Sequence, residues 1–441
     1  MNASLTRLPQ MPVDRFTKPF ARFLRIESAA GVVLLLCAGL AVGISQSPWS
    51  ASFAAFWEMP VGLRLGALEI SRSLKHWIND GLMTFFFFVV ALELKRELVV
   101  GELQDVRMAT LSFAAALGGM IVPAGLYALL VGEGARAHGW GTVMATDTAF
   151  LIGCLAVLGN RIPASLRLFL LSLAIFDDIG AVLVVAIGYG KTLDWSTLGL
   201  AALGIAFVAL LARIGVRSIP IYFLAGGMIW TALDLSGLHP TMAGVILGLM
   251  TPARGWVSDN RLHAILDRVV AYPPGDHWSG DSSARRDLQR AGIAAQEVLS
   301  PVERLEILLH PWVAFAVMPL FALANAGVPI LPERFDIAVA SAIFVGFVLG
   351  KPLGVAAFSY LAVRLGWAIL PPGLNWALLA GGGLLTGIGF TMAIFISELA
   401  FGPNLLHSAK IGILAASIVS GSAGLLALAL LTSRQPADAP D

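Results

Sequence analysis

Long apolar stretches recur along almost the whole 441-residue chain, and most have the length of a membrane-crossing helix. Lipid offers the backbone no hydrogen-bond partners, so such stretches are expected to form helices. Twelve stretches are found, at 28–46, 80–98, 108–131, 140–158, 165–189, 196–212, 218–233, 239–251, 308–330, 336–362, 374–399 and 408–431. Only 239–251 is too short to cross unaided. The sequence therefore predicts an all-α polytopic membrane protein with about 12 transmembrane helices.

The composition agrees with a membrane protein and excludes several other classes. Hydrophobic residues make up 57% of the chain and charged residues only 13%, whereas a soluble domain is about 25% charged. The net charge of +1 gives no sign of nucleic-acid binding. Cys37 and Cys154 both lie in apolar stretches and form no disulfide framework or CxxC metal site. No GxxxxGK[ST] loop is present, so we predict no cofactor and a secondary transporter rather than an enzyme.

The basic residues between the stretches indicate the orientation of the chain. With twelve spans, both termini lie on one side of the membrane, and that side holds 21 of the 29 Lys and Arg residues. The other side holds 7, and Lys351 lies within a span. Because positively charged loops stay in the cytoplasm, both termini are predicted to be cytoplasmic. The chain is therefore expected to be a multi-pass membrane protein.

The same count defines the segments outside the spans. The prediction is a single transmembrane domain at 28–432, between a cytoplasmic N-terminal tail, 1–27, and a C-terminal tail, 433–441. Segment 47–74 is expected as a small extracytoplasmic hairpin, and 252–307 as a long cytoplasmic loop with an amphipathic helix and a flexible linker.

Two adjacent acids, Asp177 and Asp178, lie near the middle of the fifth stretch, in LLSLAIFDDIGAVLVVAIG. A charge at mid-membrane costs at least about 2.5 kcal/mol, and neither helix capping nor snorkelling explains this pair. Neighbours on a helix point about 100° apart, so the two carboxylates face different partners. Desolvation and mutual repulsion oppose two bare charges, and protons or a metal cation would relieve both. The pair is therefore a candidate site for exchanging protons for a cation.

Lys351 is the candidate counter-charge for these acids. It lies in the middle of the tenth stretch, between Gly350 and Pro352, which favour a local opening of the helix. An Asp–Lys pair would lessen the cost of burying both groups. A purely architectural ion pair is the alternative interpretation. A buried lysine also loses its proton easily, so Lys351 is itself a candidate proton carrier.

Two of the predicted spans carry polar or glycine-rich interruptions. The fourth contains Thr146, Asp147 and Thr148, in VMATDTAF, and the eleventh contains Thr386, Gly387, Gly389 and Thr391, in GGGLLTGIGFT. Interrupted helices in corresponding positions of two halves indicate a transporter site. Spans three to five and ten to twelve would form inverted repeats, with the two interruptions crossing at mid-membrane. Asp147 would compensate positive helix ends, Lys351 the negative ends, and Thr146 would offer an oxygen to a cation.

Several of these stretches resemble the NhaA-type bacterial sodium/proton antiporters. The matching stretches run in order from span two to span eleven: INDGLMTFFFFVVALELKREL, MATDTAFLIG, LSLAIFDDIGA, GLHPTMAGVILG, RLEILLHPWVAFAVMPLFALANAG, VLGKPLGV and GIGFTMAIFI. NhaA itself is a known example of inverted repeats with a mid-membrane site, so the repeat prediction is not independent of this resemblance.

The resemblance implies an electrogenic antiporter that expels Na⁺ or Li⁺, takes up more than one H⁺ and serves sodium and pH homeostasis. Asp178 would be the main cation ligand and proton carrier. Asp177 would be the second titrating acid, paired with Lys351 when no cation is bound. Thr146 would help to line the site, and Asp147 would balance the helix ends. A homodimer formed through segment 47–74 is also implied.

The family is activated at alkaline pH through a cytoplasmic cluster. The matching positions are Glu93, Glu97, His239 and Glu306. One departure is Ile307, where the best-known member has His after the Glu of the RLE stretch, and a second is the long loop before it. Both departures concern the pH profile rather than the exchange chemistry.

Other functions remain open from the sequence. An intramembrane aspartic protease could pair Asp147 with Asp177 or Asp178, but the GxGD motif is missing and Lys351 would have no role. A sodium-coupled symporter would need a site for an organic anion, for which Lys351 is the candidate. An uncoupled channel is the third alternative.

Overall fold

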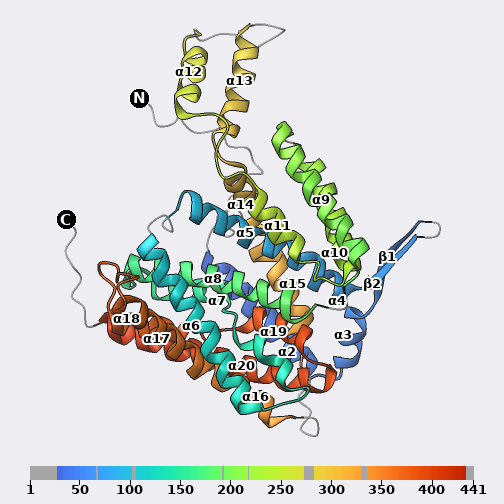
Figure 1. Cartoon of the computed structure of the whole chain (residues 1–441), viewed down its shortest axis with the longest axis vertical. Helices are drawn as coiled ribbons and strands as arrows, with labels where there is room; N and C mark the ends of the chain where they lie inside the picture. The colour runs from blue at the N-terminus through green and yellow to red at the C-terminus, as the bar shows by residue number, and fades with distance from the viewer. Residues whose placement is uncertain are drawn as a thin grey trace. The chain divides into compact units, whose positions relative to one another are not determined.

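The computed structural model describes residues 27–65, 68–101, 106–190, 193–216, 218–272, 283–328 and 335–433 (Figure 1). The predicted tails, except residues 27 and 433, and most of the predicted flexible linker lie outside these ranges. Helices dominate the described chain, which confirms the predicted all-α polytopic class. The chain divides into two compact units.

Unit 1 comprises Met1–Asn79, Thr110–Tyr189 and Pro311–Asp441. Its first part contains α2 (Glu27–Ser45), α3 (Ser50–Trp57), β1 (Pro60–Leu65), β2 (Leu68–Ser73) and α4 (Leu74–His76). Its second part contains most of α6 (Val106–Val131), the 3₁₀ segment η3 (Ala137–Val143), α7 (Thr148–Leu158), the 3₁₀ segment η4 (Gly159–Arg161) and α8 (Ala164–Gly188). Its third part contains the π-helix η5 (Val313–Val317), α15 (Met318–Asn325), α16 (Ile337–Val345), the π-helix η7 (Gly346–Gly350), α17 (Lys351–Arg364), α18 (Trp376–Leu385), α19 (Phe390–Ala400) and α20 (Pro403–Ser433). Both predicted repeats lie in this unit.

Unit 2 comprises Asp80–Ala109 and Gly190–His310. It contains α5 (Met83–Val99), α9 (Trp195–Ile214), α10 (Ile219–Ser236), α11 (Met242–Met250), α12 (Asp259–Val270), α13 (Ser283–Glu297) and most of α14 (Pro301–Trp312). The π-helix η1 (Trp77–Leu82) crosses the boundary between the units. Within unit 2, α12 and α13 lie side by side in the predicted long loop (Figure 1).

All twelve predicted apolar stretches contain helical residues. Among the described residues, nine helices are long and apolar enough to cross a membrane, and the pair α18 and α19, bent by 52°, makes a tenth candidate. The first stretch forms α2, with 19 residues, and the short eighth stretch forms α11, with only 9. Gly244 and Gly248 of α11 pack so closely on α5 that a Cβ at Gly248 would lie 2.8 Å from the carbonyl oxygen of Phe88. This close packing suits small residues at helix interfaces in lipid.

Segment 47–74 contains two antiparallel strands, with Pro60 opposite Ser73 and Leu65 opposite Leu68. The helix α3 precedes them and was not predicted, because its eight residues are too few to register as a span.

Glycines bring the backbones of α6 and α17 into direct contact. A Cβ at Gly118 would collide with the carbonyl oxygen of Gly354, and a Cβ at Gly354 would collide with that of Gly118. One turn away, a Cβ at Gly350 would lie 2.8 Å from Cα of Pro123. This contact fixes the position of α17, whose first residue is Lys351.

Candidate functional site

The first interruption lies between η3 and α7. Asp147 is the N-cap of α7, with extended backbone angles, and its side chain accepts a hydrogen bond of 3.1 Å from the backbone N–H of Phe150. The first amides of a helix have no partner within the helix and carry partial positive charge. A buried carboxylate at this point satisfies an amide and balances that charge, so the polar residue that breaks the span also caps its second half.

The second interruption, between α18 and α19, is bonded to the first. The backbone N–H of Asp147 donates to the carbonyl oxygen of Ile388 at 2.7 Å. The backbone N–H and the hydroxyl of Thr391 donate to the Asp147 carboxylate at 2.9 and 2.5 Å. Oγ1 of Thr146 lies 3.0 Å from the carbonyl oxygen of Thr386. Asp147 therefore faces the N-terminal turns of both α7 and α19, and the two interrupted spans meet at their breaks.

Glycine is required at the second break because other chain segments lie against it. A Cβ on Gly387 would lie 2.5 Å from the hydroxyl oxygen of Ser420 and 2.6 Å from the carbonyl oxygen of Phe347. A Cβ on Gly389 would collide with the ring of Phe347. The break therefore reflects close approach of neighbouring backbone as well as weak helix propensity.

Gly387→Ala is expected to destabilise the protein by about 1–3 kcal/mol, since the added methyl group has no space. The measurement is the thermal unfolding midpoint of the detergent-purified protein. Gly125→Ala in α6 is the matched control, because a Cβ at Gly125 would meet no neighbouring atom within 4 Å. Equal midpoints for the two variants would contradict the expected clash.

Asp177 and Asp178 both lie on α8 and are 0% and 1% exposed. Oδ2 of Asp177 accepts hydrogen bonds of 2.6 Å from the Lys351 ammonium and 2.6 Å from the Thr146 hydroxyl. Oδ2 of Asp178 accepts a hydrogen bond of 2.9 Å from the Thr148 hydroxyl. The neighbouring acids thus have different partners, in line with the 100° turn between adjacent helical residues.

Lys351 lies at the junction of a π-helix and an α-helix. The π-helix η7 ends at Gly350, and α17 begins at Lys351, with Pro352 in its first turn. π-helical turns occur mostly where a helix carries a functional residue. The ammonium group contacts Asp177 and Thr146 and is fully buried. As the sequence predicted, the helix is altered next to this lysine and the lysine faces the acid pair.

These groups form a compact set of oxygen atoms beside one lysine. Oδ1 of Asp177 has no hydrogen-bond partner among the described residues, although it is buried. Thr146 bridges the set to the second break, since its hydroxyl contacts Asp177, Lys351 and Thr386. Carboxylate and hydroxyl oxygens are the ligands that hard cations prefer, so this set has the chemistry of a cation site. Thr148 was absent from the predicted set, although its place in the TDT motif was the available signal.

Tyr189, just beyond α8, fixes the segment that enters the first interrupted span. Its hydroxyl donates to the carbonyl oxygen of His138 at 2.7 Å and accepts from the N–H of Gly141 at 3.2 Å. The helix with the acid pair and the helix with the first break are therefore tied together at this end.

Three of the four residues predicted for pH sensing gather in unit 2 around an arginine. Arg96 forms ion pairs with Glu97, at 3.0 Å, and with Glu306. Glu93 lies near His310, with 4.0 Å between Oε1 and Nε2. The central place of Arg96 in this cluster was not predicted from the sequence.

His239 lies elsewhere in unit 2. Its Nε2 is 3.7 Å from Oδ1 of Asp80, and its Nδ1 is 2.7 Å from the hydroxyl oxygen of Thr241. Asp80 and Glu93 lie on one continuous helix, Leu74–Val99, thirteen residues and therefore about 20 Å apart. The structure thus places His239 away from the acidic cluster with which the resemblance had grouped it.

Comparison with known proteins identifies the family of the chain. Residues 21–428 match the model of the family described as Na⁺/H⁺ antiporter 1. The Na(+)/H(+) antiporter NhaA of Rhizobium meliloti is 66% identical over 433 residues, covering 98% of this chain and 99% of that protein. NhaA 2 of Acidiphilium cryptum is 59% identical over 96% of this chain and 94% of its own, and NhaA of Rhodopirellula baltica is 50% identical over 96% and 97%. The chain belongs to the NhaA-type sodium/proton antiporter family.

Proposed function

We propose that the protein is an electrogenic secondary antiporter that exchanges cytoplasmic Na⁺ or Li⁺ for external H⁺. The observation that carries this proposal is the buried pair Asp177 and Asp178 beside Lys351, at the point where two interrupted helices meet. The relatives named as Na(+)/H(+) antiporters support the same activity.

Competition between cation and protons follows from the charges of the site. Asp178 is the main cation ligand, and Asp177 and Thr146 supply further oxygens. In the described arrangement the Lys351 ammonium holds Asp177, so a cation that takes this carboxylate must displace a positive charge. Coulomb repulsion between two cations in a low-dielectric site makes their occupancy mutually exclusive.

The electrogenic character follows from the number of proton carriers. Asp178 loses a proton when it binds the cation, and Lys351 loses a second proton when it releases Asp177. Two protons then move against one monovalent cation, and each cycle carries one net positive charge inward. Asp147 stays bonded to the N-terminal turns of α7 and α19 and offsets their positive ends, which lowers the electrostatic barrier to a cation nearby.

Purified protein in proteoliposomes is expected to release lumenal protons when Na⁺ or Li⁺ is added outside, and choline is expected to have no effect. An inward K⁺ gradient with valinomycin sets a membrane potential that should change the rate if exchange is electrogenic. A pH-sensitive dye trapped in the vesicles reports the flux. Proton movement that needs an added organic anion would favour symport, and cation flux without proton movement would favour a channel.

The cluster of Glu93, Glu97, Glu306 and Arg96 is proposed to control the response to pH, together with His239. Glu97 and Glu306 share one arginine, so a change in the charge of one acid alters the contact of the other. His239 would act separately, through its contact with Asp80. Ile307 lacks a titrating group, so the response of this chain rests on these residues.

The proposed setting is the bacterial cytoplasmic membrane, with both termini in the cytoplasm and residues 28–432 acting as one antiporter domain. The strands β1 and β2 are proposed as the contact between two copies in a homodimer, because a two-stranded sheet has two open edges for pairing.

A further inference from the structure

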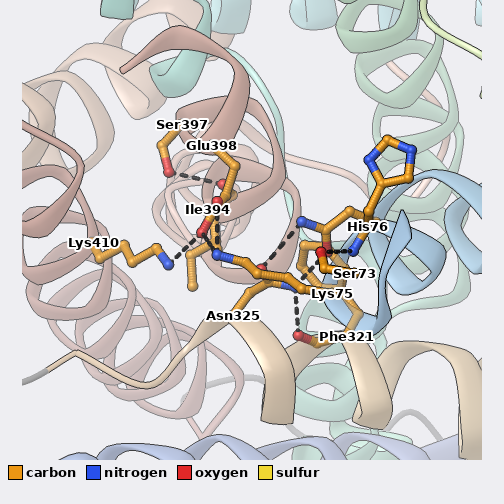
Figure 2. A network of polar contacts seen from close by, with 10 residues as sticks. Ser73, Lys75, His76, Phe321, Asn325, Ile394, Ser397, Glu398 and Lys410 are labelled. Carbon is orange, nitrogen blue, oxygen red and sulfur yellow. Dashed lines mark hydrogen bonds and ion pairs between the residues drawn. The ribbon is translucent and has the colours of Figure 1, made fainter. Parts of the chain in front are cut away.

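A second group of buried charges in unit 1 lies outside the acid pair. Glu398 stands between two lysines (Figure 2). Lys75 donates to both oxygens of Glu398 at 3.0 Å, and Lys410 donates to one of them at 2.5 Å. The side chains of Glu398 and Lys410 are only 14% and 7% exposed, and that of Lys75 is 22% exposed. The proposed exchange chemistry gives none of these three residues a role.

The three residues join three elements that are distant in the sequence. Lys75 belongs to α4, Glu398 to the last turns of α19, and Lys410 to α20. All three lie at helix ends that the loop charges place on the extracytoplasmic side. Asn79 and Asn325 exchange amide hydrogen bonds of 2.7 and 3.3 Å, and Asn325 also donates to the carbonyl oxygen of Phe321. Figure 2 shows Asn325 and Phe321 close to the lysine–glutamate group.

One helix connects this group with the helix crossing. α19 starts at Phe390, and its residue Thr391 donates two hydrogen bonds to Asp147. Glu398 follows seven residues later, about 10 Å along the same helix. Every residue from Phe390 to Ser397 is buried. A short, fully packed helix moves as one body, so a constraint on its outer end acts on Thr391 at its inner end.

We propose that Glu398 is a positioning residue for ion exchange. Held by Lys75 and Lys410, it clamps the outer end of α19 to α4 and α20 and favours the conformation in which that end is closed. The inference rests on the proposed antiport function. An alternating-access cycle must expose the site at the extracytoplasmic face, and α19 is the half-helix that reaches from the crossing toward that face.

The clamp has an excess of positive charge, because two lysines face one carboxylate. Glu398 also stands at the C-terminal end of α19, where the helix dipole disfavours an acid and favours a cation. Its carboxylate is therefore stabilised by the lysines rather than by its own helix. A glutamate at a helix end where the dipole disfavours it indicates a specific partner. Lys75 and Lys410, which belong to other elements, are those partners.

Glu398→Gln should shift the conformational equilibrium toward the state that is open to the extracytoplasmic side. A ligand binds with an apparent affinity reduced by the fraction of molecules in the competent state. Loss of the clamp should therefore raise the KM for Na⁺ at the cytoplasmic face, measured in everted vesicles, on the order of fivefold. The KM at the outer face, measured in right-side-out vesicles, should fall. Opposite changes in the two KM values indicate loss of the clamp, because a general loss of packing would not change them in opposite directions.

Two further variants keep the test decisive if Glu398→Gln folds poorly. Glu398→Gln leaves Lys410 buried next to another lysine, whereas the double variant Glu398→Gln/Lys410→Gln removes both members of the more buried pair. The double variant should accumulate like the wild type and still show the opposite KM changes. Glu398→Asp keeps the charge and should restore values close to those of the wild type.

Arg136→Gln is the matched control, since it removes an ion pair of 2.8 Å to Asp336 in the same unit from an arginine that is 48% exposed. Both KM values should remain unchanged in this variant. Wild-type KM values at both faces in the double variant, or changes of the same direction at both, would overturn the clamp. Absence of Na⁺-driven proton flux in the wild-type protein would instead overturn the proposed antiport function.

Discussion

Replacing Asp178 by Asn should abolish Na⁺-driven proton movement. The amide is nearly isosteric, but it carries no charge for a cation and does not release a proton in the physiological range. Loss of a buried contact between a charge and a cation, of about 3 kcal/mol or more, lowers affinity on the order of 100-fold. Because the same residue carries a proton, both halves of the exchange should stop together.

The measurement for Asp178→Asn is dequenching of a pH-sensitive dye in everted vesicles after Na⁺ addition. Asp194→Asn is the matched control. Asp194 caps α9 and is exposed, and hydrogen bonds from Ser196 hold its pKa below the usual range. Asparagine caps a helix as well as aspartate does, so this variant should transport normally. Robust exchange by Asp178→Asn would disprove the assigned site.

Replacing Lys351 by Gln should reduce stability and remove the electrogenic character of exchange. The change leaves the fully buried Asp177 carboxylate without its counter-charge, and breaking a buried pair in this way costs about 3–5 kcal/mol. Asp177 should then stay protonated with or without Na⁺, because its buried carboxylate has lost its counter-charge. One proton carrier is lost, so residual exchange should no longer respond to a membrane potential.

The double variant Asp177→Asn/Lys351→Gln separates these two effects. Neutralising both partners removes the unpaired charge, so the thermal midpoint should recover most of the loss seen in Lys351→Gln. Transport should not recover, because two titrating groups are missing. If Lys351→Gln has the thermal midpoint of the wild type, the ion pair does not stabilise the protein as proposed. If the double variant exchanges normally, neither Asp177 nor Lys351 carries a proton.

Much of the site could be predicted because a charge inside a membrane carries a high free-energy cost, so charged residues there are rare. Asp177, Asp178 and Lys351 stand out in apolar sequence, and the TDT and GIG motifs mark the two interruptions. Their pairing also follows, since a buried lysine and a buried acid lower each other's burial cost. The all-α membrane class came from length and hydropathy alone.

Contacts at the ends of spans could not be predicted in the same way. Charges there are tolerated as interface anchors, so Arg96 and Glu398 gave no distinctive signal. Their partners come from other elements, and only the fold brings them together. The separation of His239 from Glu93 was missed because the resemblance grouped residues by role. Their distance is set by the thirteen residues between Asp80, which contacts His239, and Glu93 on the helix Leu74–Val99.

The bond between Asp147 and Thr391 has a consequence for how the protein is made. The two residues are 244 positions apart, and at 5–20 residues per second roughly 12 to 50 s separate their synthesis. Asp147 is synthesised at the start of this interval, and Asp177 and Asp178 follow soon after. The amide and hydroxyl of Thr391 become available only at its end, when α19 is made. The early half of the chain must therefore keep these acids protonated or hydrated while it waits. When α19 is inserted, Thr391 forms its hydrogen bonds with Asp147. The buried polar contacts of the early helices are therefore completed only by the later helices.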